Sequence, residues 1–140
     1  MTYFLAKTDP ETYSLNDFER EKRTSWDGVT NPQAVKNILA MRPGDKVFIY
    51  HSGGKAAASG VVGLAKVLTE GRADPKNPKS AVADLEFTGR LEPPTTLADI
   101  KESGKFEDWA LVRQGRLSTM AAPEKFVVWM RGRYPKAKII

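Results

Sequence analysis

The chain has 140 residues, no cysteine and a formal net charge of +5. This length suits a single domain that buries its own hydrophobic core, and the lack of cysteine excludes disulfides and thiolate metal sites. No apolar run approaches the roughly 20 residues that cross a bilayer, and residues 1–10 lack the features of an export signal. We therefore expect a soluble, cytoplasmic protein that is not bound to a membrane.

The excess positive charge lies at the C-terminal end of the chain. Residues 1–110 hold 15 basic and 16 acidic residues, whereas residues 111–140 hold seven basic residues and one acidic residue. Lysine and arginine attract and hold phosphate groups, so this segment favours a polyanionic partner. A basic helix and tail in solvent would explain the charge equally well. Charge alone therefore does not assign a function.

Four elements are expected in the first part of the chain: a strand over residues 3–7, helices over residues 15–21 and 32–41, and a strand over residues 46–51. Ser14 and Asp17 have the spacing of a capping box, which predicts the start of the first helix. Asn31 before Pro32 predicts the start of the second helix, because the amide caps it and proline suits its first position.

The remaining elements follow the same pattern. We expect a small-residue loop over residues 52–59, a second loop over residues 74–79, strands over residues 61–70, 81–91 and 117–120, and helices that start at residues 97 and 123. Short helices that flank five to six strands describe an α+β fold with a mixed β-barrel or highly curved sheet. We find no repeat or linker, so residues 1–135 are predicted to form a single domain and residues 136–140 a basic tail.

Three segments that lie far apart in the sequence carry groups suited to gripping a planar heterocycle. They are residues 26–31, 48–52 and 115–118, and they offer flat rings, amides, hydroxyls and a guanidinium. Trp26 could stack on a base, although a buried core ring is the commoner fate of a tryptophan. Asn31 could pair with a base edge, although it also serves as a helix cap.

The motifs together resemble the EVE domain family, and the resemblance covers nearly the whole chain in the same order. It is carried by residues 7–10 (KTDP), 26–37 (WDGVTNPQAVKN), 41–52 (MRPGDKVFIYHS), 60–67 (GVVGLAKV) and 109–118 (WALVRQGRLS). The sequence departs from the family pattern at Thr30 and Pro32, where relatives usually carry an arginine and an aromatic ring, and in a shorter loop over residues 71–80.

The resemblance implies a PUA-like barrel that binds a modified nucleobase and does not catalyse a reaction. The base-binding positions that it implies here are Trp26, Asn31, Tyr50, His51, Ser52, Leu117 and Ser118. Phosphate or rim contacts are expected from Lys7, Lys55 and Arg116. The plain alternatives are that Arg116 pairs with Asp108 or another surface acid, and that Lys55 lies in a mobile hairpin tip.

The order Tyr50-His51-Ser52 argues against a catalytic serine. In an extended strand Tyr50 and Ser52 point to one face and His51 to the other, so the imidazole cannot reach the hydroxyl unless the strand bends. His51 is the only histidine, and a lone histidine is more often structural than a metal ligand. We predict no metal site and no cofactor.

The sequence therefore predicts a non-catalytic domain that binds DNA or RNA and reads a methylated or hydroxymethylated base. One alternative is an enzyme that acts on a modified nucleoside or nucleotide, with His51 and Lys7 as proton-transfer groups. Another is a small-molecule-binding module. Oligomeric state is left open.

Overall fold

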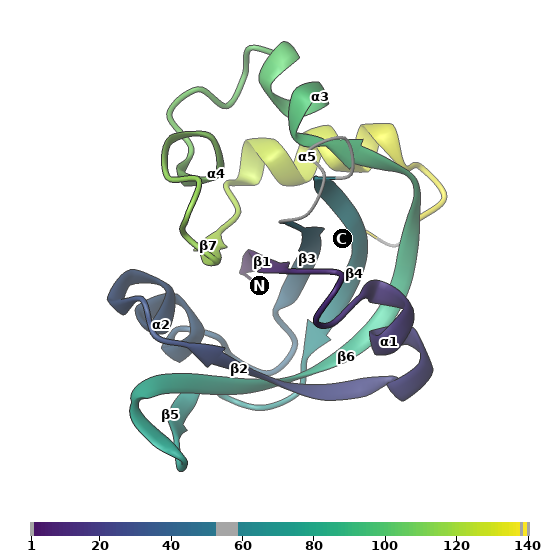
Figure 1. Ribbon diagram of the computed structural model, residues 1–140. Helices are drawn as coiled ribbons and strands as arrows, with labels where there is room; N and C mark the ends of the chain where they lie inside the picture. Colours follow the sequence, from purple (N-terminus) through teal and green to yellow (C-terminus); the bar gives the residue numbers. More distant parts are fainter. Residues whose placement is uncertain (1, 53–58, 138, 140) are drawn as a thin grey trace.

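The computed structural model describes residues 2–52, 59–137 and 139, and a single curled sheet forms its centre (Figure 1). Within these residues the strands are β1 (Tyr3–Thr8), β2 (Arg23–Val29), β3 (Lys46–His51), β4 (Gly60–Val67), β5 (Arg72–Asp74), β6 (Asn77–Thr96) and β7 (Thr119–Ala121). The helices are α1 (Leu15–Glu21), α2 (Pro32–Leu39), α3 (Leu97–Glu102), α4 (Ala110–Arg113) and α5 (Glu124–Arg133). None of these helices is long and apolar enough to cross a membrane.

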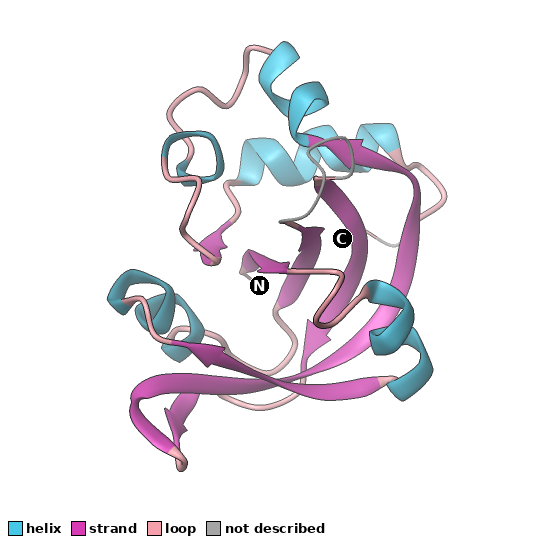
Figure 2. Cartoon of the chain, in the orientation of Figure 1, coloured by secondary structure: helices cyan, strands magenta, loops and turns pink. Residues whose placement is uncertain are grey.

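The sheet is mixed and curls into a half-barrel. Its strand order is β2-β6-β4-β3-β1-β7, with β5 paired to β6. β1 and β3 run parallel, and the other pairs run antiparallel. Short helices surround the sheet (Figure 2). The predicted α+β class, with a curved mixed sheet and short helices, is confirmed.

Helix α2 links the two end strands of the half-barrel. It begins just after β2, and the side-chain amide of Asn37 donates to the Thr119 carbonyl of β7 over 3.0 Å. The same amide donates to the Gln33 carbonyl within the helix, also over 3.0 Å. α2 therefore holds β7 near β2, although these strands are not paired to each other.

The predicted helix starts at residues 15, 97 and 123 are confirmed to within one residue. Ser14 Oγ accepts from the Asp17 amide, and Asp17 returns the contact to the Ser14 amide, which completes the capping box of α1. Thr96 and Asp99 form the same motif at α3. Pro123 precedes α5, whose residues Phe126, Val127 and Met130 are buried as expected.

Strands β2 and β5 were not predicted from the sequence. They bring the number of strands in the described residues to seven, against the expected five or six. In β2 the buried residues Trp26 and Val29 are three positions apart, because a bulge interrupts the pairing with β6 between them. The apolar and polar residues therefore do not alternate. β5 has only three residues, too few for a periodic pattern.

The prediction of a loop over residues 74–79 is wrong, because the chain makes a tight hairpin there between β5 and β6. Asp74 pairs with Asn77, and the Asp74 carboxylate accepts from the Lys76 amide over 2.8 Å. Such a contact stabilises a short turn. β6 then runs for 20 residues to Thr96, well beyond the expected strand, whereas β4 ends at Val67.

Two groups of aromatic rings occupy different parts of the core. Phe106, Trp109, Phe126 and Trp129 pack together around α5. Tyr13, Phe18, Trp26 and Phe87 form the second group, beside α1 and β2. Ile139, within the predicted tail, is buried in the hydrophobic core. Of the predicted loop over residues 52–59, residues 53–58 lie outside the described part of the chain.

Candidate functional site

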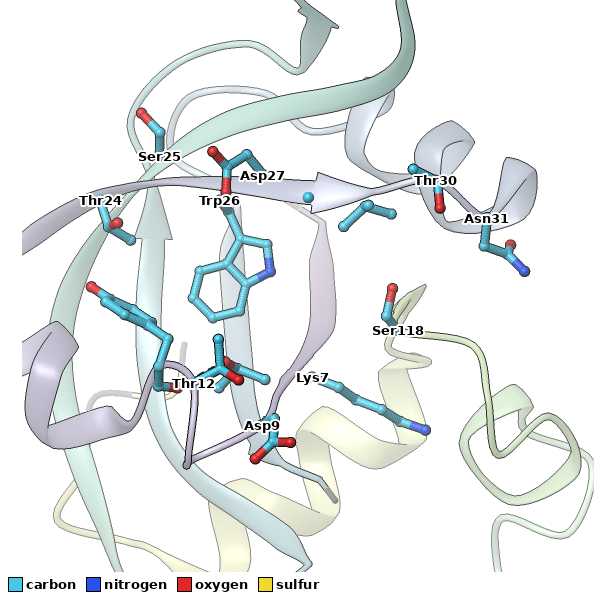
Figure 3. A pocket seen from close by; sticks show the side chains of 14 residues that line it. Lys7, Asp9, Thr12, Thr24, Ser25, Trp26, Asp27, Thr30, Asn31 and Ser118 are labelled. Carbon is cyan, nitrogen blue, oxygen red and sulfur yellow. Dashed lines mark hydrogen bonds between the residues drawn. The ribbon is translucent and has the colours of Figure 1, made fainter. Parts of the chain in front are cut away.

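A cleft of about 650 Å³ lies where the end of β1 faces β2 (Figure 3). Its volume falls within the range of roughly 300–1,000 Å³ that is typical of ligand sites. The lining residues are Lys7, Thr8, Asp9, Thr12, Tyr13, Thr24, Ser25, Trp26, Asp27, Gly28, Val29, Thr30, Asn31 and Ser118. The cleft thus combines two aromatic rings with hydroxyls, one amide, one ammonium and two carboxylates.

The bulge in β2 determines how Trp26 enters the cleft. Gly28 has a φ of +76°, which a residue with a side chain rarely adopts. The bulge separates the pair Trp26 and Ala83 from the pair Val29 and Ala81. A bulge bends the strand and redirects its side chains. Gly28 therefore has a structural reason to follow Trp26 so closely.

Two rings support the indole of Trp26. Tyr13 meets it edge-on, with ring centroids 6.2 Å apart, and Phe18 packs at 6.1 Å. Burial is the main cause that raises the pKa of Tyr13 to about 12, and its hydrogen bond to Glu21 adds to the shift. Tyr13 therefore stays neutral at physiological pH. Trp26 is only 8% exposed, yet it lines the cleft, so it is a supported wall rather than a fully enclosed core residue.

Lys7 ties β1 to the segment that carries Ser118. Its backbone amide donates to the Ser118 carbonyl over 2.8 Å, and its ammonium donates to the Gly115 carbonyl over 3.0 Å. The ammonium also lies 5.5 Å from the centroid of the Tyr50 ring, within cation–π range. Burial lowers the pKa of Lys7. Lys7 thus places an amine in the cleft wall and positions Ser118 beside it.

Asn31 caps α2, as expected, and also stands at the cleft. Its Oδ1 accepts from the amides of Gln33 and Ala34, over 2.9 and 3.1 Å, and so caps α2. Asn31 also lines the cleft. Because the oxygen is engaged by the helix, Nδ2 is the atom that remains for a ligand.

Four predicted base contacts lie outside the set of described residues that line this cleft. Tyr50 is buried beneath Lys7, and Leu117 is buried in the core. The Ser52 amide donates to the Thr8 carbonyl over 2.9 Å, which joins the end of β3 to the end of β1. His51 Nε2 accepts from the Leu15 amide over 3.0 Å at the start of α1. In this cleft these four residues act as support.

The predicted rim residues divide in a similar way. Lys7 lines the cleft, whereas Lys55 lies outside the described residues. Arg116 is exposed on the segment between Gly115 and Ser118. Asp108 lies 3.5 Å from Arg113, so the pairing of Asp108 with Arg116 that was considered as an alternative is not observed.

Sequence reasoning missed several lining residues, above all Tyr13, Thr24 and the carboxylates Asp9 and Asp27. Asp9 and Asp27 stood within quoted motifs, but nothing in their spacing indicated that β1 ends opposite β2. Over the described ranges, no group of three or more His, Asp or Glu side chains could hold a metal ion.

Comparison with known proteins agrees with the resemblance seen in the sequence. The family model described as "EVE domain" matches residues 2–131. Thymocyte nuclear protein 1 from Rattus norvegicus is 30% identical over 126 residues, which cover 71% of this chain and 55% of that protein. The chain thus spans about half the length of this curated relative.

Solved structures share the fold over almost the whole chain. A hypothetical protein from Leishmania major has a TM-score of 0.83 at 28% identity, covering 97% of this chain and 98% of that chain. Human THYN1 protein, in a complex with 5-methylcytosine-containing DNA, has a TM-score of 0.85 at 23% identity, covering 98% and 99%. The PUA-like fold predicted from the sequence is therefore confirmed.

Proposed function

This chain belongs to the EVE domain family, and we propose that it binds nucleic acid and holds one modified base in the Trp26 cleft. The observation that carries the proposal is the supported indole wall of a cleft of about 650 Å³. Stacking on an aromatic side chain contributes about 1–3 kcal/mol per base. A base leaves its own stack at a cost of a few kcal/mol, so stacking needs help from polar contacts.

The cleft has groups for those polar contacts. Its lining residues include Asn31 with its amide Nδ2, Lys7 with an ammonium and Ser118 with a hydroxyl. The carboxylates of Asp9 and Asp27 add hydrogen-bond acceptors. Human THYN1 protein has been solved with DNA that contains 5-methylcytosine. That ligand makes 5-methylcytosine DNA the first probe for this chain, with hydroxymethylated and RNA probes beside it.

Phosphate contacts are proposed from Lys7, Arg116 and Lys55 rather than from the whole basic segment. Arg131 donates to the Ile139 carbonyl, and Arg133 donates to Thr95 and lies 3.4 Å from Asp99. These arginines already have intramolecular partners near the end of α5. Arg116 is exposed and makes no side-chain hydrogen bond or ion pair within the described residues.

We propose a binding domain rather than an enzyme, and the placement of His51 supports this choice. The enzymatic alternative needs His51 and Lys7 to move protons at one ligand. His51 Nε2 instead accepts from the Leu15 amide, and His51 is not among the described residues that line the cleft. A proton-transfer group must reach its substrate within hydrogen-bonding distance.

A binding titration tests the proposal. Oligonucleotides with and without 5-methylcytosine or 5-hydroxymethylcytosine, as DNA and RNA, are titrated by fluorescence anisotropy at two salt concentrations. We expect one modified probe to bind more tightly than its unmodified twin, with affinity that falls as salt rises. Trp26→Ala should lose about five- to 100-fold in affinity for that probe and keep weak, salt-dependent binding.

Trp129→Ala is the matched control, because Trp129 of α5 packs against Phe106 and Phe126 and does not line the cleft. It should keep the preference for the modified probe. If every modified probe binds only as well as its unmodified twin, the proposal fails. Tight binding without salt dependence or need for a polynucleotide backbone would favour the small-molecule module instead.

A further inference from the structure

The indole nitrogen of Trp26 differs from that of the other deeply buried tryptophan. Trp26 and Trp109 are each 8% exposed. Trp109 Nε1 donates to the Ala121 carbonyl over 3.0 Å. Trp26 Nε1 makes no hydrogen bond to any described residue, and it is not among the polar atoms fully sealed from solvent. The Trp26 N–H therefore lacks a partner among the described residues.

A buried indole N–H normally finds an acceptor, because leaving it unpaired costs free energy. None of the described residues supplies that acceptor to Trp26, which leaves the donor for a ligand. Figure 3 shows the nitrogen-bearing edge of the indole turned toward the part of the cleft where Lys7 and Ser118 lie, and its other edge turned toward Thr24. The donor thus faces the space that a ligand would occupy.

Two neighbouring groups on this side of the cleft are also donors. Asn31 has its oxygen engaged as a helix cap, so its free atom is the Nδ2 donor. Lys7 contributes an ammonium, which has three N–H donors and uses one of them on Gly115. A ligand that pairs with these three donors has to present acceptor atoms.

We infer that Trp26 Nε1 donates a hydrogen bond to the bound nucleic acid, so that Trp26 selects an acceptor beside the stacked base in addition to supplying a stacking surface. This inference rests on the proposed function and assigns the chemistry of its ligand. An indole N–H lies in the plane of its ring, so the acceptor has to lie in that plane and not on the base that stacks on the ring face. A sugar or phosphate oxygen, or an acceptor atom of a neighbouring base, meets this requirement.

The test replaces the N–H without removing the ring. Trp26 is replaced by 3-benzothienylalanine, in which sulfur stands where the indole has N–H, and binding of the preferred modified oligonucleotide is measured. We expect affinity to fall about five- to tenfold, the value of one hydrogen bond, with an unchanged melting temperature. The same replacement at Trp109 is the matched control, and it should lower the melting temperature and leave affinity unchanged.

Indole ¹⁵N–¹H spectra give a second readout, with the signals assigned from Trp26→Phe and Trp109→Phe. In the free protein the Trp26 N–H should exchange with water faster than the Trp109 N–H. On addition of the probe the Trp26 signal should shift downfield and become protected, whereas the Trp109 signal should stay in place.

The outcomes separate this inference from the proposed function. If no modified oligonucleotide is preferred by the wild-type chain, the proposed function fails. If a modified probe is preferred but the sulfur analogue binds it as tightly as wild type, only the donor role is wrong. A Trp26 N–H that is already as protected as that of Trp109 in the free protein would also overturn the inference.

Discussion

The two tryptophans show how equal burial can accompany different roles. Trp109 and Trp26 are equally exposed, and each contacts other aromatic rings. Trp109 has its N–H paired with the Ala121 carbonyl and forms part of the core around α5. Trp26 has one side against Tyr13 and Phe18 and another facing a cleft. The partner of the indole N–H thus separates a structural tryptophan from the one proposed to bind a ligand.

The largest expected effect comes from Trp109→Ala, which tests the structural side of this comparison. The change removes a large buried ring and leaves the Ala121 carbonyl without its donor. We expect a loss of about 3–5 kcal/mol in the free energy of unfolding, measured by urea denaturation. Trp26→Ala should cost less, because one side of its ring already faces open space.

Binding measurements complete that comparison. The folded fraction of Trp109→Ala should still prefer the modified oligonucleotide, whereas Trp26→Ala should lose the preference while remaining folded. If both variants lost stability and preference in parallel, the distinction between the two tryptophans would be wrong.

A smaller effect is expected at Asn31, where cap and ligand contact share one side chain. Asn31→Ala removes the acceptor for the Gln33 and Ala34 amides and should cost about 1 kcal/mol of stability. Asn31→Ser keeps a capping oxygen, so its stability should stay near that of wild type. Both variants lack the Nδ2 donor and should bind the modified probe about two- to tenfold more weakly.

The serine variant separates the two roles of Asn31. Thermal denaturation reports the cap, and anisotropy titration reports the ligand contact. Wild-type affinity in Asn31→Ser would show that Asn31 serves α2 alone, and the donor side of the cleft would then reduce to Trp26 and Lys7.

Local signals in the sequence predicted every helix except α4, because a helix cap depends on residues only a few positions apart and α4 has no side-chain cap. Ser14 with Asp17 and Thr96 with Asp99 both form the expected capping box. β2 was missed because its bulge at Gly28 breaks the alternation of buried and exposed residues. β5 was missed because three residues form a strand only through pairing with β6.

The candidate site was predictable only in part, since its residues meet through strand pairing. The family resemblance placed Lys7, Trp26, Asn31 and Ser118, and all four line the cleft. It could not show that Tyr50 lies beneath Lys7, or that Tyr13 supports Trp26. His51 contacts a backbone amide 36 positions away, which no local pattern indicates.

The smallest expected effect concerns His51, which supports the Trp26 ring indirectly, through helix α1. Its Nε2 accepts from the amide of Leu15, the first residue of α1, and Phe18 of that helix packs against Trp26. Burial is the main cause that lowers the pKa of His51, and the charge of Arg90 adds to it. Protonation would replace this acceptor with a second donor, so the contact requires neutral imidazole.

The pH dependence of stability follows from the direction of that shift. A lowered pKa in the folded state gives stability that is present above the unfolded pKa of about 6.5 and is lost as pH falls through the folded value. Melting temperatures between about pH 7.5 and about pH 5 should therefore fall more steeply for wild type than for His51→Gln, whose amide oxygen accepts without titrating. The difference in slope isolates His51, because both proteins carry the same carboxylates. Equal slopes would show that folding does not change the pKa of His51, which would contradict the burial of a neutral imidazole at the start of α1.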